Sequence, residues 1–405
     1  MINPLLKFQK RVKCKMWKKW QLFNATDFQS LMYPCFFLCS ILGIFPYKIN
    51  HGSTFEISKQ RYILSTVVLC VLCTCELVIL YMIDIAGTIN LGDIRRTLQR
   101  NCYFILGNFI AIVTYVLSGL RMDLLQAVIN ISSKLSLNSY KKLSRLIHTK
   151  DIFGFFFLFM MTMYYYSQID HWYKALVPHV TFLVFQTDML YINCVCILKA
   201  CFKTIDNNLI NLREPIANDE PNNPFLLMEL KALKKQHMKI SDTVEMLNMV
   251  FSLPLLATMS ITFFGIIFEL YYCMLHWKIG ILINFNMDNL GFDIFAIGFM
   301  TFYTLKTVLI AWAGETGKDQ AMKIGITVHD LLNNSSDKQI KNELRLFSLQ
   351  VLHCENTFTV KGLIVDITLL TAIVVNTTTY VLILLQSLIV SYICNGKTNN
   401  VIHII

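Results

Sequence analysis

The sequence predicts an all-α membrane protein with seven transmembrane helices, a cytoplasmic N-terminus, a short non-spanning N-terminal helix and cytoplasmic helical extensions. Three observations predict this class: the composition, the arrangement of apolar residues in blocks, and the distribution of positive charge. Of the 405 residues, 55% are hydrophobic and 15% are charged, whereas a soluble domain has about 25% charged residues. A soluble chain of this length could not cover so much apolar surface.

The apolar residues fall into eight stretches, and a bilayer core about 30 Å thick needs about 20 mostly apolar residues per helix. The stretches cover residues 28–47, 62–84, 101–120, 151–170, 175–201, 251–275, 290–313 and 362–392. The first contains Pro34, stops at Pro46 and barely reaches the length of a span. We therefore expect a short interfacial or re-entrant helix there, and seven spans from the other stretches.

The positive charges predict the orientation, because cytoplasmic flanks of membrane helices carry an excess of lysine and arginine. With the N-terminus inside, 28 of the 36 lysine and arginine residues fall in inner segments and six in outer ones. The inner segments are 1–61, 121–150, 202–250 and 314–361. We therefore expect a multi-pass protein of the cell membrane with a cytoplasmic N-terminus and an extracellular C-terminus.

The net charge of +10 follows from this bias and from attraction of the basic N-terminus to anionic lipid, so no nucleic-acid partner is expected. The 13 cysteines predict no metal site or cofactor. Those within the spans are read as small packing residues, and the pair Cys70 and Cys73 has no second pair beside it. Without a metal-ligand cluster, a nucleophile elbow or a glycine-rich phosphate loop, the chain is not expected to be an enzyme.

The predicted cytoplasmic connections have helical periodicity. Apolar residues recur every three or four positions in 121–150, in 225–251, and in 326–333 followed by 340–352. This spacing is typical of helices that bury one face. Because 225–251 continues into a span, we expect membrane helices that extend into the cytoplasm and pack together there. Residues 213–224, rich in Pro, Asn and acidic residues, are predicted to be a flexible connector.

Polar and aromatic side chains gather toward the outer halves of the predicted spans. A cavity lined by aromatic residues with a few polar groups is typical of a small-molecule site. The alternative is an interfacial belt of aromatic residues, and the sequence leaves both open. The candidate ligand-binding residues are Tyr164, Tyr165, Gln168, Phe185, Gln186, Asp188, Glu269, Tyr271, Tyr272 and Phe295.

The last span carries a polar stripe on an otherwise aliphatic helix. Spacings of three and four residues place the members of the stripe on one face: Thr368, Ala372, Val375, Thr379, Ile383 and Gln386. One interpretation is hydrogen bonding between helices. The other is a pore face, in which neutral polar groups face water and aliphatic groups form a gate. A single helix cannot enclose a pore, so the second interpretation requires a symmetric assembly.

The same segment resembles the final-helix signature of insect gustatory receptors. That signature is a Thr-Tyr pair, five mostly apolar residues and a glutamine, with an aspartate near the helix start; here these are Thr379, Tyr380, Gln386 and Asp366. Residues 42–49, LGIFPYKI, resemble the turn that ends the short first helix of that family. One departure is Ser387, where the family usually has an aromatic residue.

The resemblance implies a taste receptor that acts as a ligand-gated, non-selective cation channel related to insect odorant receptors. Four identical or different gustatory receptor subunits would surround a pore lined by the last helix, at Thr379, Ile383 and Gln386, with Ser387 or Val390 near the gate. The ligand would be a small-molecule tastant. Val381 follows the Thr-Tyr pair, where the sugar-receptor branch commonly has glutamate, so a bitter or amine-like ligand is expected rather than a sugar.

The resemblance divides the chain into four regions. Residues 1–61 form the cytoplasmic N-terminus, 62–361 a six-helix ligand-binding region with cytoplasmic anchor helices, 362–392 the seventh, pore-lining helix, and 393–405 an extracellular tail. The alternatives are a G-protein-coupled receptor and a secondary transporter. A G-protein-coupled receptor would place its N-terminus outside, against the charge distribution. A secondary transporter would show Gly or Pro interruptions paired in matching halves of the sequence, and no such pairing is evident.

Overall fold

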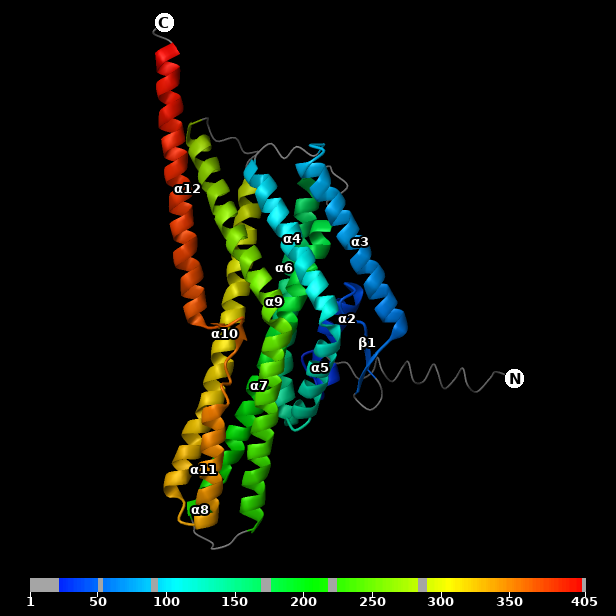
Figure 1. The fold of residues 1–405 in the computed structure, drawn as a ribbon, viewed down its shortest axis with the longest axis vertical. Helices are drawn as coiled ribbons and strands as arrows, with labels where there is room; N and C mark the ends of the chain where they lie inside the picture. The colour runs from blue at the N-terminus through cyan, green and yellow to red at the C-terminus, as the bar shows by residue number, and fades with distance from the viewer. Residues whose placement is uncertain are drawn as a thin grey trace, which may run out of the picture.

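The computed structural model describes residues 22–49, 54–88, 94–168, 176–217, 224–282 and 290–402, and these are almost entirely helical (Figure 1). The elements in chain order are α2 (Phe28–Ile41), β1 (Tyr47–Ile49), β2 (Phe55–Ile57), α3 (Lys59–Asp84), α4 (Ile94–Val116), α5 (Ser118–Ser132), α6 (Leu137–Gln168), α7 (Leu176–Asn211), α8 (Arg213–Ala217), α9 (Pro224–Leu282), α10 (Leu290–Asn334), α11 (Lys338–His353), β3 (Thr359–Val360), β4 (Leu363–Ile364) and α12 (Ile367–Ile402).

The membrane-crossing helices agree with the predicted stretches. Six described helices are long and apolar enough to cross a membrane, and a seventh crossing results if α4 and α5, which are bent by 67° at Leu117, count as one span. At this bend the carbonyl of Ser118 accepts a hydrogen bond from the hydroxyl of Tyr47 in β1. The seven-helix fold class predicted from the apolar blocks is therefore confirmed.

The first apolar stretch forms the short helix α2. Asp27 caps it by accepting a hydrogen bond from the backbone N–H of Ser30 at 2.8 Å, and the hydroxyl of Ser30 accepts one from the backbone N–H of Asp27 at 3.2 Å. This reciprocal cap fixes the helix start. The 14 residues of α2 give a length of about 21 Å, which is too short to cross a bilayer core about 30 Å thick.

Two small hairpins were not predicted. In the first, β1 pairs antiparallel with β2, and in the second, β3 pairs antiparallel with β4. The second hairpin occupies the start of the stretch predicted as the last span, so the helix begins at Ile367 and not at residue 362. The turn between β3 and β4 places Lys361 and Gly362 at positive φ, 49° and 86°, which ends regular pairing there.

Helix α7 lies at the centre of the bundle and α12 at its edge (Figure 1). In their most apolar windows, 94% of α7 is buried but only 11% of α12. A helix that is apolar on all sides is stable in the core of a helical protein, and α7 is buried almost continuously from Val180 to Leu198. Helix α12 packs against α9 and α10, and most of its surface is open within one chain.

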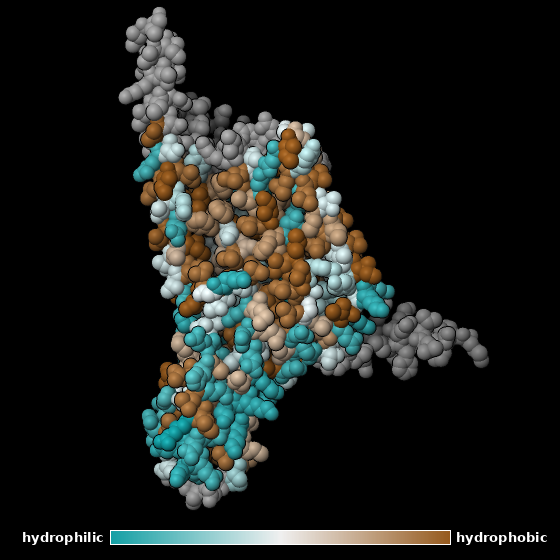
Figure 2. Space-filling view, in the orientation of Figure 1, coloured by the Kyte–Doolittle hydropathy of each residue, from teal (hydrophilic) through white to brown (hydrophobic). Residues whose placement is uncertain are grey.

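The helices continue beyond the apolar band into a polar extension, which we define as residues 203–217, 224–250 and 314–353. Figure 2 shows the apolar band as brown and the extension as teal. Helix α9 is 59 residues long and α10 is 45, so the predicted extension of membrane helices is confirmed. The predicted flexible connector 213–224 is corrected in part, because residues 213–217 form α8; residues 218–223 lie outside the described residues.

Candidate functional site

The start of α12 is fixed by Asp366, the aspartate of the recognised motif. Its Oδ1 accepts hydrogen bonds from the backbone N–H groups of Thr368 at 2.9 Å and Leu369 at 3.3 Å, and from the hydroxyl of Thr368. A carboxylate in this position satisfies free N–H groups and interacts favourably with the helix dipole. Its Oδ2 lies 3.8 Å from Nζ of Lys318, which joins the start of α12 to α10.

The hairpin β3–β4 fastens this start to α9. The side-chain amide of Asn248 donates to the carbonyl of Thr357 at 2.8 Å and accepts from the N–H of Thr359 at 3.1 Å. The hydroxyl of Ser252 accepts from the N–H of Lys361 at 2.7 Å. Because Asn248 and Ser252 are one turn apart on α9, these bonds tie one face of that helix to the residues preceding α12.

On the other side, α10 approaches the same segment through a glycine. A Cβ added at Gly314 would lie 2.1 Å from the carbonyl oxygen of Val365, far inside the contact distance. Gly317 is similarly close to the ring of Phe358, at 2.6 Å. The backbone before α12 is therefore held directly against the surface of α10.

Helix α12 has two distinct faces. Val381 and Thr377 are buried, and the ring of Tyr380 contacts Phe263 of α9 with centroids 5.8 Å apart. The polar stripe faces away from this contact. All six of its members are exposed: Thr368, Ala372, Val375, Thr379, Ile383 and Gln386.

The predicted gate residues continue this exposed face. Ile383 is 52% exposed and Val390 60%, and Gln386 and Ser387 are exposed as well. The hydroxyl of Thr379 donates to the carbonyl of Val375 at 3.0 Å, so its oxygen remains free to accept. A face of this kind can line water if several copies meet, or it can bond to a neighbouring helix.

Three of the predicted ligand residues lie on α7, and each contacts another side chain or the backbone within the bundle. The amide of Gln186 donates to the carbonyl of Cys35 in α2 at 3.2 Å. The ring of Phe185 packs against Phe302, with centroids 6.2 Å apart. The carboxylate of Asp188 is fully buried, 3.2 Å from Nζ of Lys306.

The other described candidates lie along different contacts. Glu269 on α9 accepts a hydrogen bond from the amide of Gln99 on α4 at 2.9 Å. Tyr271 is buried and Tyr164 is half-buried. The described candidates therefore lie on three helices: Tyr164 on α6, three residues on α7, and Glu269 and Tyr271 on α9. The remaining side chains lie outside the described part of the structure: Tyr165, Gln168, Tyr272 and Phe295.

Sequence reasoning missed several residues in this region. Lys306 was counted as a charge but given no role, although a lysine and an aspartate within apolar spans are each costly unless paired. That cost was the available signal for the pair with Asp188. Tyr303 on α10 was also missed. Its ring fills the space left by Gly265, where a Cβ would lie 2.7 Å away.

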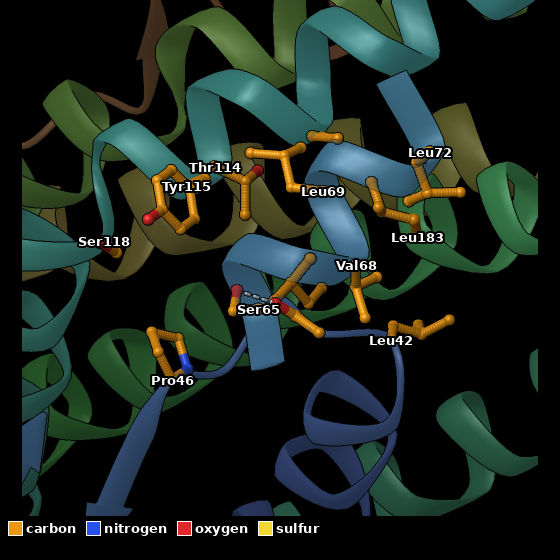
Figure 3. A pocket seen from close by; sticks show the side chains of 13 residues that line it. Leu42, Pro46, Ser65, Val68, Leu69, Leu72, Thr114, Tyr115, Ser118 and Leu183 are labelled. Carbon is orange, nitrogen blue, oxygen red and sulfur yellow. Dashed lines mark hydrogen bonds between the residues drawn. The ribbon is translucent and has the colours of Figure 1, made fainter. Parts of the chain in front are cut away.

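A small cavity lies between α3, α4 and α7, closed on one side by the turn after α2 (Figure 3). Its space for water is about 20 Å³, room for little more than one water molecule. The hydroxyl of Ser65 donates to the carbonyl of Gly43 at its edge, and Thr114, which lines it, is buried. A cavity of this size holds no drug-sized ligand.

Within the described ranges, no group of three or more His, Cys, Asp or Glu side chains is placed to hold a metal ion. Cys194, Cys196 and Cys201 of α7 are buried and form no disulfide. Cys73 is tied to α4, where its sulfur donates to the side-chain oxygen of Asn108 at 2.9 Å.

Comparison with known proteins gives one family. A family model described as "7tm Chemosensory receptor" matches residues 32–390. The putative gustatory receptor 28b of Drosophila melanogaster is 30% identical over 158 residues, which are 37% of this chain and 32% of that protein. The alignment therefore spans about a third of that relative's length.

Solved structures show the same fold. The insect olfactory receptor OR5 from Machilis hrabei matches with a TM-score of 0.65 and 12% sequence identity, over 89% of this chain and 98% of that one. The match is the same for its structure alone and for its structure in complex with eugenol. At this identity the likeness concerns the arrangement of helices and nothing finer.

Proposed function

Because this chain belongs to the 7tm chemosensory receptor family, we propose that it is a gustatory receptor subunit that forms a ligand-gated, non-selective cation channel. It is a multi-pass membrane protein, and its fold is that of a solved insect olfactory receptor. The proposal concerns the finer activity: a small-molecule tastant binds among the outer halves of the helices and opens an ion path along α12.

The observation that carries the proposal is the exposed stripe of α12. A face with threonine and glutamine side chains would be costly against lipid, and a single subunit leaves it open over the length of the span. Four copies, identical or mixed with other gustatory receptor subunits, would bring these faces together around an axis. Thr379, Ile383 and Gln386 would then face the ion path, with Ser387 and Val390 near its narrow end.

The ligand is proposed to bind near the contact between α4, α9 and α10, where Glu269 meets Gln99. Tyr303 of α10 lies close enough to Glu269 to interact with it electrostatically. A carboxylate beside an aromatic ring suits an amine or a bitter alkaloid better than a sugar. The described interior is closely packed, so the ligand would bind by parting helices that touch in this structure. The fastening of α9 to the residues before α12 gives such a movement a route to the pore helix.

The first experiment is expression in oocytes with current recording against sugars, bitter alkaloids, amines and amino acids. We expect a cation current in response to an alkaloid or an amine. If this chain alone gives no current, co-expression with other gustatory receptor subunits is the second arm. A ligand-evoked signal in the same cells without any ionic current would contradict the channel proposal.

The pore is tested by residues of similar exposure on opposite faces of α12. Ile383 and Val374 are 52% and 57% exposed, and at about 100° per residue they point about 180° apart on the helix. We expect Ile383→Ala and Gln386→Glu to change conductance or cation selectivity, and Val374→Ala to leave both unchanged. Equal effects of Ile383→Ala and Val374→Ala would remove the stripe from the ion path.

A further inference from the structure

Arg121 is a buried arginine in the first turn of α5, immediately after the bend that separates this helix from α4. Its side chain is 1% exposed and lies within the bundle. The guanidinium carbon is 5.5 Å from the centroid of the Phe251 ring on α9. The polar groups that act on it electrostatically are Tyr47, Cys35, Cys39 and Cys194, so β1, α2, α7 and α9 surround it.

No hydrogen-bond acceptor reaches this guanidinium from the described residues. Its Nε, Nη1 and Nη2 are all buried without a partner. The nearby tyrosine and cysteines are ordinarily neutral at pH 7, and the hydroxyl of Tyr47 is already donated to the carbonyl of Ser118. One aromatic ring is the main compensation for a full positive charge.

The other buried cations nearby are paired. Lys150 forms an ion pair with Asp151, which also accepts from the amide of Asn193 at 2.8 Å. Lys306 pairs with Asp188. In the described interior, Arg121 therefore leaves one positive charge without a counter-ion, and an uncompensated buried charge costs several kcal/mol. Buried polar atoms without partners commonly mark a missing water or ion.

We propose that Arg121 is the core of a binding site for a small inorganic monoanion of the size of chloride or bromide. One unpaired charge calls for one negative charge, and its donor atoms can bind a single ion. The guanidinium is enclosed, so a lipid phosphate in the membrane cannot reach it without opening the bundle. The ion would lock α5 to α7 and α9 at the junction between the apolar band and the polar extension.

The test is thermal unfolding of the purified full-length protein as chloride or bromide replaces gluconate at constant ionic strength. Gluconate is a much larger anion than chloride or bromide and should not replace them at an enclosed guanidinium. We therefore expect the melting temperature to rise by about 2–4 °C with the small anions and to reach a plateau. Arg121→Met, which keeps an unbranched apolar stem and removes the guanidinium, should abolish the rise. Arg145→Met is the matched control, because Arg145 is an exposed arginine on α6, and it should keep the rise.

If Arg121→Met does not fold, Arg121→Lys serves instead and should shift half-saturation to at least several-fold higher chloride. Three results would overturn the proposal. They are a wild-type melting temperature that is the same in chloride and gluconate, a rise without a plateau, and a rise with unchanged half-saturation in the Arg121 variant. The last would place the anion elsewhere, and the first would leave water as the partner of Arg121.

Discussion

At the scale of single residues, the energetic cost of a charged side chain inside the apolar band depends on its partner. Asp188 and Lys306 are both buried and lie 3.2 Å apart, joining α7 to α10. The sequence showed each of them as an unusual charge in an apolar stretch. It could not pair them, because the partners are 118 positions apart and their meeting depends on how α7 and α10 pack.

Removing one partner of this pair should be more harmful than removing both. Asp188→Leu leaves the ammonium of Lys306 buried and unpaired, and we expect a loss of about 3–5 kcal/mol. The double variant Asp188→Leu with Lys306→Met replaces the pair by apolar side chains and should recover most of that loss. Thermal unfolding of both variants measures the difference. Equal losses in the two would mean that the ion pair itself is what stabilises the contact.

His237 is a buried titratable residue in the polar extension. Its ring is fully buried, 5.6 Å from that of Phe347 on α11, and the amide nitrogen of Gln350 is 3.1 Å from its Nδ1. An amide nitrogen only donates, so Nδ1 must be an acceptor and the ring neutral. Burial lowers the pKa of His237 from its usual 6.5 to about 4.

The polar extension should therefore lose stability in mild acid. Between pH 6.5 and 4 the unfolded chain binds a proton at His237 and the folded chain does not, so stability falls as the pH is lowered through this window. At pH 5 the loss is about 2 kcal/mol, measurable by thermal unfolding at pH 7.5 and pH 5. His237→Gln should reduce this pH dependence, and His329→Gln, at an exposed histidine of α10, should not. Equal pH dependence in both variants would contradict the assignment.

At the scale of elements, the sequence predicted helices well and the hairpins not at all. Long apolar and periodic stretches, such as 225–251 followed by 251–275, correspond to the 59 residues of α9. The hairpin β3–β4 has two residues in each strand. The N–H groups of Thr359 and Lys361 donate to the side chains of Asn248 and Ser252, which are more than a hundred positions away. Local sequence propensity therefore could not predict this hairpin.

The two glycines Gly314 and Gly325 of α10 allow a direct test of the contact with the start of α12. At Gly314 an alanine Cβ would meet the carbonyl of Val365 at 2.1 Å, whereas at Gly325 it would meet a methyl of Val351 at 3.4 Å. We expect Gly314→Ala to cost about 1–3 kcal/mol and to impair ligand-evoked currents. Gly325→Ala should be neutral or gain up to about 1 kcal/mol from helix propensity. Similar behaviour of the two in unfolding and recording would contradict the close approach.

At the scale of the whole molecule, burial declines from the centre of the bundle to α12. The stripe of α12 could be recognised from its spacing alone, because helical periodicity places residues on a face without any knowledge of the neighbours. The grouping of the ligand candidates could not, since it depends on contacts between α4, α7, α9 and α10. Gln186 illustrates the difference: its position on α7 suggested an outer cavity, and its amide contacts Cys35 of α2.

The orientation in the membrane remains a prediction of the charge distribution, and it can be tested on the whole chain. The basic residues before residue 62 and those of the polar extension should keep both segments in the cytoplasm, because moving many positive charges across the membrane is unfavourable. An epitope inserted between Ala217 and Pro224 should therefore be labelled only after permeabilisation, and one at the C-terminus should be labelled on intact cells. A glycosylation acceptor at the same two positions gives an independent readout, since only the outer one is modified. The reverse pattern would invert the assigned sides and would move the proposed ligand site to the cytoplasm, while leaving the fold unchanged.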